Sequence, residues 1–428
     1  MSRRAPFTRQ RRRSLEALVI DDEDLLYLIL TRCSLRDLAR TACINSVWQR
    51  ASRDAYTDWR RRQGLYLVGG CCDGPHPASA KAVRTVYKYD EVADEWMRCA
   101  DLMKARDHLG VVGFDGELHA VGGWSGARNR ASCETYCPRD DVWRISQHRL
   151  HTPRSGLVAA VREDGTCFVA AGWGGSHLGF LSSTETLNCA DAIAARPPAS
   201  PTTDDAAAAS ATPGRRITRK WSAAAAAANT AAATAAPGSS SPLSPAMPTP
   251  PPRTVGRETA PLQMARHCPA AATLGHFLYL TGGTGSSADV NGGQATPTRC
   301  VERLDTACHR TGWARDPVAP MLVPRYRHAC AALDGRLYAC GGQKTDGKAT
   351  ASVEMYDPSS NTWVHVAALH RARFSHAMAS LHGRLYVVGG FADGQWLSDV
   401  ERYNPQRDEW EVLSELPSAV SASGLAVA

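Results

Sequence analysis

Short runs of apolar or alternating residues recur along most of the chain, separated by glycine, aspartate and asparagine-proline. The stretch at residues 370–413 holds four such runs, of which the second ends in Gly389-Gly390 and the fourth contains Trp410. Short runs between turn residues are typical of β-strands, so this stretch predicts an antiparallel four-stranded meander. Four short strands cannot bury both faces of their own sheet, and we therefore expect neighbouring units of the same kind.

The glycine-ended run and an aromatic pair repeat through the chain. The run recurs at residues 65–70, 118–123, 168–172, 278–283, 337–342 and 385–390. An aromatic residue and a tryptophan follow it seven residues apart, in Tyr89/Trp96, Tyr136/Trp143, Tyr356/Trp363 and Tyr403/Trp410. Paired glycines after a β-branched run let the backbone take a positive φ or pass close to a neighbouring strand. The repeats predict a mainly β domain over residues 62–428.

An arginine forms the third repeated signal. It stands thirteen residues before a ring residue of the second strand, in Arg106/His119, Arg266/Tyr279, Arg325/Tyr338 and Arg373/Tyr386. Three coincident signals with a period of about fifty residues resemble the kelch repeat. The resemblance covers roughly residues 62–428 and implies a β-propeller of six four-stranded blades.

The end of the chain is expected to complete the first blade, which begins at Leu65 without a first strand of its own. When the tail at residues 416–428 is superposed on the last repeat, Ala428 takes the place of Leu381 and Val420 takes the arginine position. We therefore expect the C-terminal residues to form the inner strand of blade one and to close the ring. Closure removes the exposed sheet edges that an open array would keep.

Blade three and the segment after it depart from the repeat. Ala171-Gly172 replaces the double glycine, and residues 184–187 stand where an aromatic strand is expected. Residues 190–260 are rich in alanine, proline, serine and threonine, which bury little apolar surface, so we expect a low-complexity insertion that stays unfolded. We interpret Trp221 as the fourth-strand tryptophan of this blade; the alternative is that blade three has none.

Residues 14–61 carry apolar residues at helical spacing and predict two or three short amphipathic helices. Such a small core is usually completed against a partner or a neighbouring domain. The segment resembles an F-box in its DLL and IL opening at residues 24–30, the run SLRDLARTAC at 34–43, Trp48 and Trp59, with residues 20–22 standing where Leu-Pro is usual.

The F-box resemblance implies binding to a Skp-type adaptor, which bridges such modules to a cullin–RING ubiquitin ligase. The residues expected to contact the adaptor are Leu25, Leu28, Ile29, Leu35, Leu38, Val47 and Trp48. The alternative is that these helices form a cap or an oligomerisation segment on the propeller.

Composition and charge narrow the class of protein. The formal net charge is +7, and the only basic run lies within residues 1–13, which form either a nuclear-import signal or a solvated tail. We find no apolar run long enough to span a bilayer and no secretory signal.

The 14 cysteines fall mostly on strand or helix positions, so we expect free thiols in the reducing cytoplasm or nucleus. Their spacing gives no zinc motif, and we expect no metal, no cofactor and no nucleic-acid partner.

The predicted target-binding face lies at one end of the ring, where the loop before the first strand and the loop after the double glycine both emerge. It comprises Arg106, Arg154, Arg266, Arg325, Arg373, Trp124, Trp173 and Phe391. Guanidinium groups and aromatic rings suit an acidic or phosphorylated peptide, and the kelch resemblance implies that such arginines contact ligand. The alternative is that the arginines pair with the recurring strand-three glutamates, Glu134, Glu185, Glu302, Glu354 and Glu401.

A catalytic role is not expected, because no serine or cysteine nucleophile recurs beside a base and an orienting acid. The first hypothesis is therefore a non-catalytic substrate receptor of a Skp–cullin–F-box ubiquitin ligase, with an unknown target protein held on the propeller. The second is a binding scaffold with no link to ubiquitin, and the third is a propeller enzyme.

Overall fold

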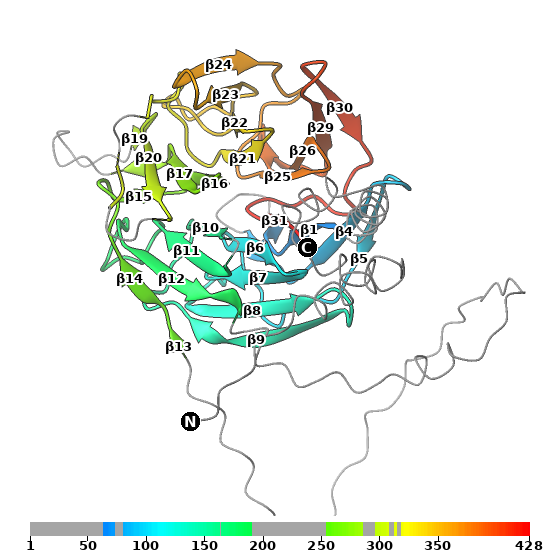
Figure 1. Cartoon of the computed structure of the whole chain (residues 1–428). Helices are drawn as coiled ribbons and strands as arrows, with labels where there is room; N and C mark the ends of the chain where they lie inside the picture. The colour runs from blue at the N-terminus through cyan, green and yellow to red at the C-terminus, as the bar shows by residue number, and fades with distance from the viewer. Residues whose placement is uncertain are drawn as a thin grey trace, which may run out of the picture. The chain divides into compact units, whose positions relative to one another are not determined.

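The computed structural model describes residues 63–72, 80–162, 164–190, 254–285, 296–307, 312–314 and 318–428, which are mainly β-structure (Figure 1). The predicted tail at residues 1–13 and the F-box-like module at 14–61 lie outside the described residues. So does most of the 190–260 segment, including Trp221.

Six sheets repeat the predicted antiparallel meander, five of them with its four strands and sheet 4 with three strands among the described residues. Sheet 1 contains β31 (Gly424–Val427), β1 (Leu65–Val68), β4 (Val86–Asp90) and β5 (Glu95–Arg98). Sheet 2 contains β6 (Gly110–Phe114), β7 (Glu117–Val121), β8 (Ser132–Cys137) and β9 (Val142–Arg149), with β13 (Thr254–Val255) parallel to β9 at its edge. Sheet 3 contains β10 (Val158–Val161), β11 (Thr166–Ala170), β12 (Thr184–Asn188) and β14 (Arg257–Thr259).

The later sheets follow the same order. Sheet 4 contains β16 (Ala270–Leu274), β17 (Phe277–Thr281) and β20 (Val301–Asp305). Sheet 5 contains β21 (Ala329–Leu333), β22 (Arg336–Cys340), β23 (Val353–Asp357) and β24 (Thr362–Val366). Sheet 6 contains β25 (Ala377–Leu381), β26 (Arg384–Val388), β29 (Val400–Asn404) and β30 (Glu409–Leu413).

Two-residue strands form three further small sheets beside these six. They are β2 (Cys71–Cys72) with β3 (Lys81–Ala82), β15 (Arg266–His267) with β18 (Thr284–Gly285) and β19 (Thr296–Pro297), and β27 (Phe391–Ala392) with β28 (Gln395–Trp396).

The double glycines sit where the backbone of one sheet meets the next. Gly389 and Gly390 have φ values of 63° and 111°, which disfavour residues with a Cβ. A Cβ on Gly389 would lie 2.5 Å from the carbonyl oxygen of Val420, in the following sheet. The prediction that these glycines provide a positive φ and a close approach is confirmed.

The aromatic pairs spaced by seven residues are cross-strand neighbours. Tyr136 on β8 lies opposite Trp143 on β9, with ring centroids 5.0 Å apart. The Tyr136 hydroxyl donates to Asp141, whose carboxylate accepts the N–H of Ala100, while Trp143 Nε1 donates to the carbonyl of the same alanine. Because Ala100 lies in the connection from sheet 1, each such unit holds the chain segment that links its sheet to the one before.

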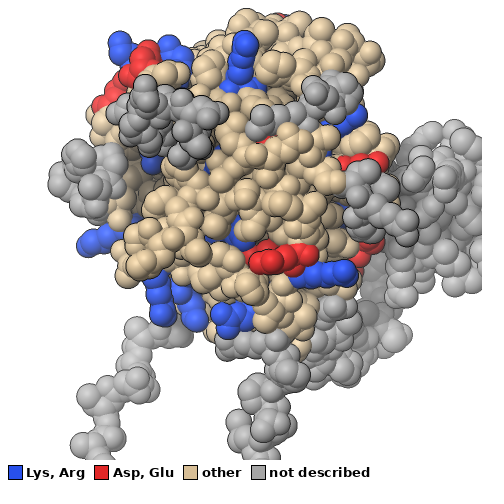
Figure 2. Space-filling model, turned by 90° about the vertical axis from the view of Figure 1, so that its left-hand side faces the viewer, with Lys and Arg blue, Asp and Glu red and all other residues tan. Residues whose placement is uncertain are grey.

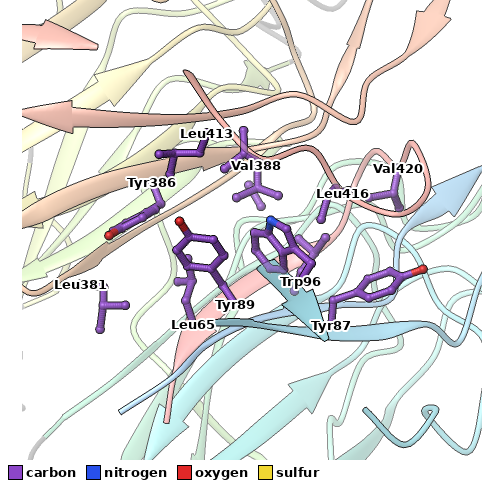
Figure 3. Close-up of a cluster of buried hydrophobic side chains, with 13 residues drawn as sticks. Leu65, Tyr87, Tyr89, Trp96, Leu381, Tyr386, Val388, Leu413, Leu416 and Val420 are labelled. Carbon is purple, nitrogen blue, oxygen red and sulfur yellow. The ribbon is translucent and has the colours of Figure 1, made fainter. Parts of the chain in front are cut away.

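The C-terminal residues pair with β1, as the sequence predicts. β31 is antiparallel to β1, with Leu65 opposite Val427, the register given by superposing the tail on the last repeat (Figure 1). Side chains of sheet 1 then pack against those of sheet 6: Tyr89 and Trp96 share a buried cluster with Tyr386 and Leu413 (Figure 3). The two ends of the described domain are therefore joined by backbone hydrogen bonds and by apolar packing.

The first strands of successive sheets contact one another in sequence. β6 contacts β10, β10 contacts β16, β16 contacts β21, and β21 contacts β25. β31 contacts both β25 and β6, so the series of contacts returns to its start.

The outer strand of sheet 3 corrects one prediction. It is β14, which pairs with β12 and contains no tryptophan, so the interpretation of Trp221 as its tryptophan is wrong. Trp313, from the chain following sheet 4, is buried and donates its indole N–H to Thr184 of β12.

Removal of residues 424–428 should lower the melting temperature sharply, because β1 would lose its partner strand and the sheet 1 to sheet 6 contact would be exposed. Thermal unfolding followed by circular dichroism measures this. Removal of Ala428 alone is the matched control and should change the melting temperature little. Equal melting of the full chain and the shortened chain would show that β31 does not stabilise the domain.

Candidate functional site

The five repeated arginines are buried, and each pairs with a glutamate on the third strand of its own sheet. Their side chains are 0% exposed. Nη2 lies 2.5–2.6 Å from a glutamate oxygen in Arg106–Glu134, Arg154–Glu185, Arg325–Glu354 and Arg373–Glu401, and Arg266 pairs with Glu302 in the same way.

Backbone carbonyls accept hydrogen bonds from the other Nη group of each guanidinium. In sheet 5, Arg325 Nη1 donates to the carbonyls of Gly341 and Ser352, at 2.7 and 2.9 Å. Glu354 in turn accepts the backbone N–H groups of Leu322 and Val323, just before the arginine. One ion pair thus connects three parts of the sheet: the chain segment before the arginine, the double glycine and the third strand.

The prediction that these arginines line a target-binding face needs correction. Their Nη groups donate inside the sheets and the arginines are buried, so they cannot reach a ligand at the mouth. The alternative, pairing with the strand-three glutamates, describes the arrangement found. In sheet 1 both partners change together, since Val420 replaces the arginine and Tyr87 the glutamate, and this leaves no buried charge unpaired.

The residue after each arginine lies beside the residue after the double glycine of the same sheet. Isolated bridges join Asp107 to Trp124, Ser155 to Trp173, Tyr326 to Gln343, Phe374 to Phe391 and Ser421 to Cys71, and His267 pairs with Thr284 in the same position. The two predicted loop positions therefore emerge together at one end of the domain, which we call the mouth.

The mouth holds a cavity of about 1080 Å³ to which all six sheets contribute. The predicted residues Trp124, Trp173 and Phe391 all line it, together with Phe374 and Trp396, which the sequence analysis missed. Their rings form contiguous surfaces: Phe391 lies 5.5 Å from Phe374 and 5.0 Å from Trp396, centroid to centroid.

A second layer lies below the mouth, formed by the residues two positions after each arginine site. Their backbone groups form a closed ring of hydrogen bonds of 2.7–3.0 Å, in which each N–H donates to the preceding carbonyl: Gly156 to His108, Cys268 to Gly156, Arg327 to Cys268, Ser375 to Arg327, Ala422 to Ser375 and His108 to Ala422. All six residues have φ between 48° and 59°. We call these six residues the throat.

Arg327 is the throat residue with a cationic side chain. Its guanidinium lies 5.4 Å from the ring centroid of Tyr326 and 5.8 Å from that of Phe374. It lines the cavity, and within the described ranges its Nε has no hydrogen-bond partner. The sequence signal for it was its position, two residues after a repeated arginine, and that signal carries no indication of exposure.

Metal chemistry and membrane insertion receive no support from the part of the chain described. Within it, no cluster of three or more His, Cys, Asp or Glu side chains could hold a metal ion. The same part has no helix with the length and apolarity to cross a membrane. The predicted adaptor-binding residues, from Leu25 to Trp48, lie outside it.

Similar sequences carry kelch repeats. Residues 255–427 match the KLHDC2/KLHL20/DRC7 Kelch-repeats domain, and residues 63–103 match the Kelch motif. Kelch-like protein 35 of Mus musculus is 37% identical over 150 residues, which are 35% of this chain and 23% of that protein. Kelch-like protein 36 of Mus musculus is 31% identical over 166 residues, 38% of this chain and 25% of that protein.

An F-box/kelch-repeat protein is also similar. SKIP30 of Arabidopsis thaliana is 31% identical over 105 residues, which are 24% of this chain and 29% of that protein. The chain thus matches less than a third of the length of each of these three relatives.

Arg325→Met should destabilise the domain by about 3–5 kcal/mol, because it leaves Glu354 charged and buried without a partner. Adding Glu354→Leu should recover part of this loss, since it removes the unpaired charge but also the acceptor for Leu322 and Val323. Denaturant unfolding of the wild type, the single variant and the double variant measures both effects. A single variant as stable as the wild type would contradict the structural role of the pair.

Proposed function

We propose that this chain, a kelch-repeat protein, is a non-catalytic substrate receptor of a Skp–cullin–F-box type ubiquitin ligase. In this proposal the six sheets are the blades of a propeller closed by β31, and the mouth captures a segment of a target protein. The N-terminal residues 14–61 bind the Skp-type adaptor, and the protein works in the cytoplasm or the nucleus. The observation that carries the proposal is the cavity at the mouth, lined from all six sheets.

The lining of the mouth suits a peptide segment better than a small substrate. The cavity is at the upper end of the roughly 300–1,000 Å³ of typical small-molecule sites and offers aromatic surfaces from separate sheets, as at Trp124, Trp173 and Trp396. Aromatic anchors with a polar surround are typical of protein-binding surfaces. A peptide crossing the mouth could contact several sheets at once.

The charges around the mouth indicate which side chain of a target would be bound. Arg327 and Lys348 line the cavity on the side of sheet 5, Asp107 on the side of sheet 2 and Asp393 on the side of sheet 6. An acidic side chain of the target could pair with Arg327, whose guanidinium is flanked by Tyr326 and Phe374. The sequence analysis attributed a preference for an acidic segment to the five repeated arginines. In this proposal Arg327 alone provides it.

On the one side of the domain that Figure 2 shows, the charge distribution favours a protein target over a nucleic acid. On the side of the domain seen in Figure 2, lysine and arginine side chains of the coloured residues lie in small separate groups with acidic side chains among them. A nucleic-acid-binding surface needs basic residues clustered on one face.

The second candidate function is a kelch-propeller binding scaffold without a ubiquitin ligase. The same cavity supports it, and the similarity to kelch-like proteins does not separate the two functions. Binding to the adaptor is therefore the property that discriminates between them.

Trp124→Ala combined with Trp396→Ala should weaken capture of target proteins by up to about 1,000-fold, because buried aromatic anchors contribute about 2 kcal/mol each at interfaces, or about 30-fold each. Proteins captured from a lysate by the wild type and the variant can be compared by quantitative mass spectrometry. The matched control is Val412→Ala, an exposed residue on the outer strand β30. Unchanged capture by the double variant would exclude the mouth as the target site.

Leu38→Asp with Trp48→Asp in the full chain should abolish co-purification with a Skp-type adaptor, because each change places a charge in the apolar face expected to contact it. Arg327→Glu is the control and should keep the adaptor while losing the target. Absence of adaptor from the wild type, or equal binding by the helix variant, would leave the scaffold as the function.

A further inference from the structure

A cysteine lies in the layer below the mouth. Cys268 belongs to the throat and lines a small cavity of about 110 Å³. His108, Arg327 and Ser375 line both this cavity and the larger one above it, so the two spaces adjoin. Cys268 itself is buried and lines only the smaller cavity, so the thiol lies beneath the large one.

The thiol is held against a histidine. Cys268 Sγ lies 3.4 Å from Nε2 of His267, the preceding residue, which itself lines the larger cavity. Gly156 in the neighbouring sheet leaves room for this pair, because a Cβ there would lie 2.3 Å from His267 Nε2 and 3.0 Å from Cys268 Sγ. A cysteine beside a histidine base is the arrangement that activates a thiol as a nucleophile.

The groups facing this thiol are mostly basic. Arg327 holds the next throat position, His108 lines the same small cavity from beyond Gly156, and His108 is paired with Asp107 at 2.9 Å. Burial alone would raise the pKa of Cys268, but His267, His108 and Arg327 together lower it to about 6. The thiolate is the form in which a cysteine reacts.

Cys71 provides a contrast within the same opening. It also lines the larger cavity, but its Sγ donates to the carbonyl of Ser421, and burial raises its pKa to about 12. Position at the mouth therefore does not by itself activate a thiol, whereas the neighbours of Cys268 do.

Two further side chains indicate that the small cavity accepts a polar occupant. His328 is buried, lines this cavity and bonds Thr281 through Nε2, while its Nδ1 has no partner among the described residues. Arg327 Nε likewise has no hydrogen-bond partner within those residues, and the guanidinium can pair with a carboxylate. An anionic group near the thiol would supply a hydrogen-bond acceptor for the Arg327 guanidinium.

We propose that Cys268 is a site of thiol–disulfide exchange with small anionic disulfides, with His267 activating the sulfur and Arg327 binding a carboxylate of the reagent. The Cys268 thiolate attacks one sulfur of the disulfide, a new sulfur–sulfur bond forms, and the second half leaves as a thiolate that takes up a proton. No further oxidant is needed. This modification is independent of the proposed role as a substrate receptor.

The test uses the folded full chain and glutathione disulfide, with modified cysteines identified by peptide mass spectrometry. Cys268 should form the mixed disulfide much faster than Cys71, and its rate should be half-maximal near pH 6, against about 8.5 for an ordinary thiol. His267→Asn should move this midpoint towards the ordinary value while the melting temperature stays near that of the wild type. Equal labelling of Cys268 and Cys71 would overturn the proposal.

The charge of the reagent tests the role of Arg327. Glutathione disulfide should react with Cys268 roughly tenfold faster than the cationic disulfide cystamine, and Arg327→Gln should remove this preference. Because both reagents act on the same folded protein, a loss of stability in the variant would slow or speed both together. A preference that survives Arg327→Gln, or a rate midpoint near 8.5 in the wild type, would refute the assignment.

Discussion

The buried arginine–glutamate pair is the interaction on which the repeat depends. In sheet 5, Arg325 donates to two backbone carbonyls, and Glu354 accepts two backbone N–H groups from the segment before the arginine. A buried charge is tolerated only with a partner and with its remaining hydrogen bonds made, so the pair persists or disappears as a unit. Sheet 1 follows this rule, since Val420 and Tyr87 replace both members.

The pair also decides where chemistry can occur. By fixing the backbone just before the first strand, it presents the next two residues at the mouth and in the throat, whatever their side chains are. The mouth positions accordingly hold side chains as different as Asp107, His267 and Phe374, and the throat positions hold His108, Cys268 and Arg327. Stability resides in the repeated residues, and the residues that differ between sheets are free to recognise a ligand.

Repetition also explains what could be predicted from the sequence. Aligning one repeat on another predicts the glycine pairs, the Tyr–Trp pairs and the register of Val427 opposite Leu65. Each of these features depends on backbone geometry that is the same in every repeat. The direction of a side chain does not follow from such an alignment. Arg325 was placed at the right end of the domain, yet its guanidinium turns inward to Glu354, and only the recurrence of the glutamate indicated this.

Trp221, Arg327 and Cys268 mark the limits of that reasoning. The outer strand of sheet 3 is Arg257–Thr259. It is short and has no aromatic residue, so no signal in the sequence indicated a strand there. Arg327 and Cys268 occur once each, and a residue that does not recur is invisible to a search for repeats. Their properties come from neighbours in other sheets, which only the fold brings together.

The throat shows how a single side chain can acquire reactivity without disturbing the repeat. Its closed ring of backbone hydrogen bonds holds five non-glycine residues at positive φ, a conformation that costs each of them on the order of 1 kcal/mol or more when unsupported. Because the ring is formed by backbone atoms, its geometry does not depend on the side chains. Cys268 can therefore sit between His267 and Arg327 on a scaffold that sheets 1 to 6 maintain together, and the absence of a side chain at Gly156 gives the thiol its space.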